Sequence, residues 1–83
     1  NSTPQDLVIE QSGFYALTAL NDRGTDTLMV AIFNANGDCL YSTTIFEATN
    51  YSQISTPILR LQAGNYKYRG VGGVINLIHY INQ

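Results

Sequence analysis

Apolar and polar residues alternate with a period of two along most of the chain, which is the period of β-strands. No window has the 3.6-residue period of an amphipathic helix. The alternation predicts seven strands, at residues 6–10, 14–20, 27–33, 38–46, 54–61, 66–69 and 74–81. Their regular spacing predicts an all-β fold with about seven short antiparallel strands, in a sandwich or a jelly-roll-like small barrel.

Turn-forming residues separate these strands. Asn36-Gly37 between two extended runs is a strong signal for a β-hairpin. Pro57 lacks a backbone donor, so it predicts an edge position or a bulge in the strand at 54–61. Residues 1–5 are polar and contain Pro4, which indicates a flexible N-terminal arm. Residues 6–83 are then expected to form a single β-sandwich domain.

The strand predicted at 27–33 is apolar without alternation, which indicates burial on both of its faces. In a small two-layer domain one face of a strand normally meets solvent. We therefore expect a neighbouring subunit to cover the outer face of this strand. The candidate interface residues are Leu28, Val30, Ile32 and Phe33.

A chain of 83 residues buries a limited core, and such domains are commonly supported by disulfides, metals or oligomers. Cys39 is the only cysteine, so an internal disulfide is excluded, and it is expected to be a small buried hydrophobe. With one histidine and one cysteine the chain also lacks a zinc-type cluster, so oligomerisation or attachment to a larger assembly becomes the expected support. Charged residues make up 12% of the chain and the net charge is −2, which provides no basic footprint for nucleic acid.

Residues suited to catalysis are few. His79 is the only histidine, and if Ile75, Leu77 and Ile81 face the core it shares their face, where a histidine packed in the core or at an interface is expected. The acids lie mostly at strand ends and turns, where aspartates usually bond their own backbone. We therefore expect no enzymatic activity, no cofactor and no metal site.

The tyrosines are the most suggestive side chains. Tyr66 and Tyr68 share one face of a predicted strand, and Arg69 follows them. These three residues form the candidate binding platform. Exposed tyrosines beside arginine can stack on sugar rings or bury area at a protein interface, and ordinary packing at a sheet edge remains the third interpretation.

Three segments carry a resemblance to known families: residues 12–17, residues 28–33 with Asn36-Gly37, and residues 59–66. Their succession resembles two groups of β-sandwich modules. One is the complement/tumour-necrosis-factor-like jelly rolls, including those that cap phage and bacterial fibres as trimers. The other is the bacterial pre-peptidase C-terminal type. The chain is shorter than a full jelly roll of the first group, which implies that strands are missing or supplied by a neighbour. No binding residue of either family can be carried over.

Together these observations predict a non-enzymatic structural or assembly module, such as a virion decoration or fibre component acting through self-association or docking. The resemblance favours a homotrimer, attachment to a larger assembly, and an extracellular or virion-surface location. The alternative is a carbohydrate-binding or adhesion module of a secreted protein. Neither nucleic-acid binding nor membrane insertion is expected.

Overall fold

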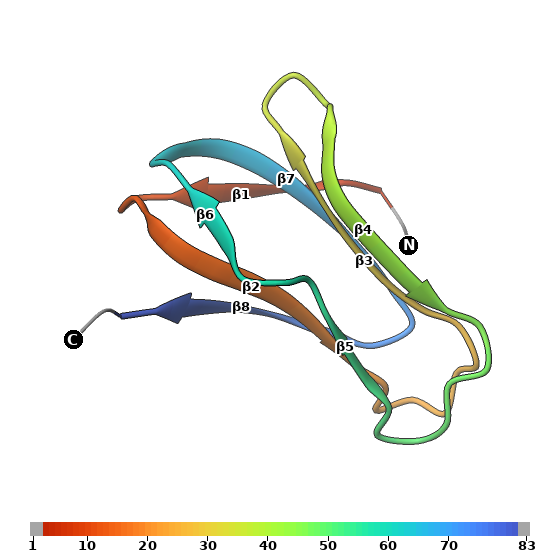
Figure 1. Cartoon of the computed structure of the whole chain (residues 1–83). Helices are drawn as coiled ribbons and strands as arrows, with labels where there is room; N and C mark the ends of the chain where they lie inside the picture. The colour runs from red at the N-terminus through yellow and green to blue at the C-terminus, as the bar shows by residue number, and fades with distance from the viewer. Residues whose placement is uncertain (1–2, 82–83) are drawn as a thin grey trace.

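The protein is a two-layer β-sandwich, seen in a computed structural model that describes residues 3–81 (Figure 1). The described residues form no helix, and thus none that is long and apolar enough to cross a membrane. They contain eight strands: β1 (Gln5–Ile9), β2 (Gly13–Leu20), β3 (Leu28–Asn34), β4 (Cys39–Ile45), β5 (Gln53–Ser55), β6 (Leu59–Leu61), β7 (Gly64–Val71) and β8 (Val74–Tyr80). The predicted all-β sandwich is confirmed, and the barrel alternative is not, because the two sheets do not close on each other.

Both sheets are antiparallel. Sheet A has the strand order β1-β7-β3-β4. Sheet B is built around β2, which pairs with β8 along one edge and with both β5 and β6 along the other. Since β5 and β6 follow one another along the same edge, sheet B is three strands wide where sheet A is four.

Pro57 divides the strand that was predicted at residues 54–61. β5 pairs with the end of β2 and β6 with its beginning, and Thr56 lies between them. Thr56 is buried, and it exchanges two hydrogen bonds with Leu17: its amide donates to the Leu17 carbonyl at 2.9 Å, and its hydroxyl accepts from the Leu17 amide at 3.0 Å. The backbone amide and carbonyl of Leu17 in β2 therefore remain hydrogen-bonded at the interruption between β5 and β6.

The first strand begins earlier than predicted. Gln5 was assigned to a flexible arm, but it is the first residue of β1 and pairs with Tyr68. Asn1 and Ser2, also assigned to that arm, lie outside the described residues.

The core is formed by alternate residues of both sheets. Leu28, Val30 and Ile32 of β3 are 0–1% exposed and pack against the inward side chains of β2. The prediction that these three residues form an interface between subunits is therefore wrong, because their side chains lie inside the sandwich. Phe33, the fourth candidate, is half-buried.

The outer face of β3 is covered within the chain at its centre, whereas Met29 and Phe33 on the same face are half-buried. Ala31 is 3% exposed although it faces away from the core. It lies in the middle of sheet A, opposite Arg69 of β7 on one side and Ser42 of β4 on the other. Alanine has a small side chain, and the strands on both sides of Ala31 leave little of it exposed. The double burial predicted for this strand thus has an explanation that does not require a second subunit.

The connection from β7 to β8 carries the chain from sheet A into sheet B (Figure 1). Gly72 has a φ of +92°, which favours glycine, and a β-carbon there would collide with the carbonyl of Thr27. A β-carbon at Gly73 would collide with the carbonyl of Leu20. The β7–β8 connection thus passes close to the backbones of Thr27 and Leu20, and this close approach fixes the position at which β8 begins.

Two asparagines organise the loops. In the predicted Asn36-Gly37 hairpin, which is confirmed, the side-chain oxygen of Asn34 accepts hydrogen bonds from the amides of Asn36 and Asp38. Asn21 is fully buried after β2. Its side-chain amide donates to the carbonyls of Thr25 at 2.6 Å and Thr49 at 2.8 Å, which ties two loops together.

We expect Asn21→Ala to lower the free energy of unfolding by about 2 to 4 kcal/mol, because two carbonyls in a buried setting lose their donor. Chemical denaturation followed by circular dichroism measures this loss. The matched control is Asn50→Ala, since Asn50 is exposed in the neighbouring loop and should be nearly neutral. Equal stability of the Asn21 and Asn50 variants would contradict the assigned role.

Candidate functional site

The predicted platform of Tyr66, Tyr68 and Arg69 does not form a single surface. Tyr66 and Tyr68 share a face of β7, as predicted, but it is the inner face, where both rings are half-buried against the core. The Tyr66 hydroxyl donates to the carbonyl oxygen of Gln62 at 2.8 Å. Arg69 lies on the opposite face, beside Ala31. The structure therefore brings the two tyrosines together and separates them from the arginine.

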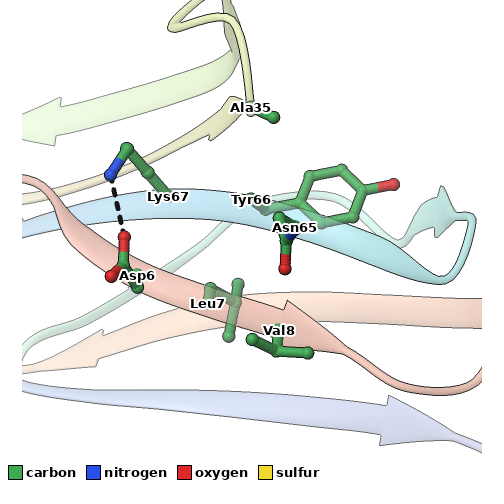
Figure 2. A pocket seen from close by; sticks show the side chains of 7 residues that line it. All are labelled: Asp6, Leu7, Val8, Ala35, Asn65, Tyr66 and Lys67. Atoms are coloured by element: carbon green, nitrogen blue, oxygen red, sulfur yellow. Dashed lines mark hydrogen bonds and ion pairs between the residues drawn. The ribbon is translucent and has the colours of Figure 1, made fainter.

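An open hollow of about 380 Å³ lies beside Tyr66, where β1 meets β7 (Figure 2). Its lining residues are Asp6, Leu7, Val8, Ala35, Asn65, Tyr66 and Lys67. The two charged groups in it are paired with each other, since the Lys67 ammonium donates to the Asp6 carboxylate at 2.8 Å. A paired acid and base with no second acid beside them offer no obvious acid–base chemistry.

His79 lies on the inner face of β8, as predicted, opposite Tyr15 of β2. The two rings stack with centroids 4.3 Å apart and planes inclined by 13°. The Tyr15 hydroxyl donates to the carbonyl oxygen of Gln11 at 2.6 Å. The ring of this single histidine thus serves as a packing surface.

Cys39 was predicted to be buried, but it is exposed at the start of β4. The β3–β4 ladder shifts register between Cys39 and Tyr41, so Cys39 pairs with Phe33, which lies on the outer face of sheet A. Within residues 3–81 no three His, Cys, Asp or Glu side chains gather where they could hold a metal ion.

The most unusual surface is β8. Val74, Leu77, Ile78 and Tyr80 are large apolar side chains that remain exposed, and Ile81 follows them. Val74, Ile78 and Tyr80 are on the outer face of sheet B, whereas Leu77 points to the inner face. Leu77 is nevertheless 39% exposed, although its partner Leu17 in β2 is buried. The hydrophobic core is thus partly exposed to solvent beside β8.

β8 is also an edge strand. It pairs with β2 over all seven of its residues without a bulge, and no other strand in the described part of the chain pairs with it. Its second edge therefore presents a row of unpaired backbone amides and carbonyls. Residues 70–83 contain no Asp, Glu, Lys, Arg or Pro, which are the residues that usually protect such an edge.

The other edge strands, β1, β4, β5 and β6, have features that discourage pairing with another chain. β1 is five residues long, has Pro4 just before it and carries the charged Asp6. The edge made by β5 and β6 consists of two three-residue strands separated by Pro57. β4 is as long as β8, but its pairing with β3 contains a register shift, and Ser42-Thr43-Thr44 make its middle polar. Short strands, charges, prolines and bulges all discourage pairing with another chain.

A seven-residue edge that is regular, lacks Asp, Glu, Lys and Arg and exposes large apolar side chains on both faces is suited to accept another strand. The backbone provides the hydrogen bonds, and alternate side chains provide the contacts on each face. Sequence reasoning placed a strand here but did not identify it as the site. The signal that could have done so was the absence of charge from residues 70–83.

A second hollow, of about 340 Å³, lies at the end of β8 on sheet B. A row of side chains crosses β8, β2 and β6 on the outer face of sheet B. It consists of Tyr80, Phe14 and Arg60, because Phe14 pairs with both of the other residues. The Arg60 guanidinium lies 5.8 Å from the centre of the Phe14 ring. Gln11 and Ser12 also line this hollow.

Comparison with protein-family models, curated proteins and solved structures finds no match for this chain.

The Lys67 ammonium lowers the pKa of the Asp6 carboxyl, through their hydrogen bond and their opposite charges. Because the folded pKa is below the unfolded one, this contribution to stability is present above the unfolded pKa and is lost as pH falls through the folded pKa. We expect Lys67→Met to raise the pKa of Asp6, measured by NMR titration of its carboxyl carbon. Arg23→Met is the control, since Arg23 pairs with Asp22 and should leave the Asp6 titration unchanged. An unchanged pKa in the Lys67 variant would contradict the pairing.

Proposed function

We propose that this protein is a non-enzymatic assembly module that docks by accepting a strand along the free edge of β8. The observation that carries the proposal is that β8 is the one long edge in the described chain with neither charge, proline nor bulge. Proteins that remain separate usually blunt such edges, because an unprotected strand pairs with other chains. An edge left unprotected over seven residues is best explained by a partner that occupies it.

The side chains of β8 support the same proposal. Val74, Ile78 and Tyr80 would contact a partner on the outer face of the extended sheet, while Leu77 would contact it on the inner face. Each of these side chains is exposed in the single chain, so an added strand removes apolar surface from water on both sides. The backbone hydrogen bonds add directionality to this apolar contact.

The described polar groups also favour a binding role over catalysis. His79 packs flat on Tyr15, and the Asp6 carboxylate is paired with Lys67. The setting that we propose, a virion or fibre outside the cytoplasm, rests on the sequence resemblance and on the low charge of the chain.

Strand acceptance can be tested with a fluorescent peptide of residues 74–80 carrying two lysines at each end for solubility. We expect saturable binding measured by fluorescence anisotropy, with slower hydrogen exchange at the amides of β8. The variant Leu77→Lys places an inward-pointing charge on the edge strand, a device that blocks strand pairing, and should weaken binding at least about tenfold.

Two controls make this test specific. Val8→Lys introduces the same charge at an exposed position of β1 and should bind the peptide normally. A peptide with proline at the position of Ile78 should bind poorly, because proline removes a backbone donor. Failure of the unmodified peptide to bind, or equal binding by the Leu77 and Val8 variants, would overturn the proposed docking edge.

A carbohydrate-binding module is the second candidate function, and the row of Tyr80, Phe14 and Arg60 favours it. Both rings are exposed on the outer face of sheet B, and Arg60 lies alongside them. An aromatic surface with nearby donors such as Gln11 and Ser12 suits the alternating apolar and hydroxyl groups of a sugar. This row takes the place of the platform at Tyr66, Tyr68 and Arg69.

If this second function holds, a glycan array should show selective binding that is lost in Phe14→Ala. Phe46→Ala is the matched control, because Phe46 is an exposed phenylalanine outside this row, after β4, and its loss should leave binding unchanged. The circular dichroism spectra of both variants verify that each is folded. Equal glycan binding by the two variants would exclude the row as a sugar site.

A further inference from the structure

We propose that the strand accepted by β8 is the β8 of a second copy of this chain, paired antiparallel about Leu77 in a two-fold symmetric dimer. This inference rests on the proposed function and specifies its partner. An antiparallel pair of identical strands is self-complementary across a two-fold axis, so the same surface on both copies is used.

Charge is the first argument for a second copy. A partner strand of β8 should itself be uncharged, since a charged residue on it would lose water against apolar neighbours. β8 meets this requirement over its whole length, and it has no like charge that would oppose its copy. The edge of β1, by contrast, would bring two Asp6 carboxylates near one another in a similar pairing.

Geometry is the second argument. Directly opposite residues of antiparallel strands point to the same face, so inner side chains of one β8 meet inner side chains of the other. The sheets B of the two copies then form one continuous sheet. The partly exposed cores of both copies lie next to each other on one side of this sheet, and the two outer faces lie next to each other on the opposite side. Leu77, which points inward but is 39% exposed, would be covered by its own counterpart.

The register follows from the length of the strand. Leu77 is the midpoint of Val74–Tyr80, so a two-fold axis at Leu77 pairs all seven residues and any other centre pairs fewer. In this register each pair includes at least one apolar side chain. The opposed residues are Val74 with Tyr80, Ile75 with His79, Asn76 with Ile78, and Leu77 with its own copy.

This pairing closes with two copies. Each chain has one free β8 edge, and the contact uses it completely. A dimer therefore replaces the trimer favoured by the sequence resemblance. In this dimer the β4 edges of the two copies do not contact each other, so a residue on β4 can serve as the control in a cross-linking experiment.

Cross-linking tests the register directly. In a Cys39→Ser background, we expect Leu77→Cys alone, or a mixture of Asn76→Cys and Ile78→Cys proteins, to form a disulfide dimer under mild oxidation. One of these two pairings falls at a position without direct hydrogen bonds, where the β-carbons approach closely enough for a disulfide. Thr44→Cys, exposed on β4, is the matched control and should remain monomeric under the same conditions.

Light scattering coupled to size-exclusion chromatography over a range of concentrations gives the uncross-linked mass. We expect a monomer–dimer equilibrium whose dissociation constant rises at least about tenfold in Leu77→Lys and stays unchanged in Val8→Lys. A monomer at every concentration would overturn self-pairing, as would a dimer that cross-links through Thr44→Cys and not through β8. Binding of the β8 peptide by a chain that stays monomeric would overturn the dimer alone and leave strand acceptance intact.

Discussion

Sheet B depends on the pairing of β2 with its neighbours on both edges. Every other strand of that sheet pairs with β2, and the residues from Tyr15 to Ala19 are all buried, on both faces. On the outer face the buried residues of this run are the small Ala16, opposite Ile78 of β8, and Thr18, opposite Asn76. The same ladder decides which side chains of β8 point inward, because each takes the face of its partner in β2. Thus β8 is held in place by one strand, and its opposite edge is left without a partner in the described chain.

The alternation of the sequence was enough to predict where most strands lie and which residues share a face. The turn residues Asn36-Gly37 predicted the hairpin, and the alternation predicted the common face of Tyr66 and Tyr68. It could not show which of the two faces points inward, and for that reason the tyrosines were interpreted as a platform. Pro57 predicted an edge position or a bulge, and β5 and β6 do form an interrupted edge of sheet B. The hydrogen bonds that join Thr56 to Leu17 at this interruption were not predictable, because Leu17 is far away in sequence.

The order of strands in the sheets decides where the candidate site lies, and it is set by long-range pairing. The apolar run at residues 27–33 lies at the centre of sheet A, so its burial is internal. The run at 74–81 has a similar composition, but it ends up at an edge, so its apolar side chains remain exposed. Two similar patterns therefore differ in role because one strand has neighbours on both sides and the other has one. Only the absence of charge around β8 distinguished them beforehand.

The open edge of β8 would connect the proposed assembly with the stability of the chain. A chain of this size has little apolar surface to bury, and here part of it, including the inward-facing Leu77, is left uncovered. An added strand would satisfy the backbone of the edge and cover this surface in one step, so the binding energy would also be folding energy. The stability of such a chain rises with the concentration of its partner, which favours a domain that works within an assembly. A charged residue on β8 would make the separate chain safer from aggregation, but it would also remove the proposed contact, which would cover the open core as well as join the partners.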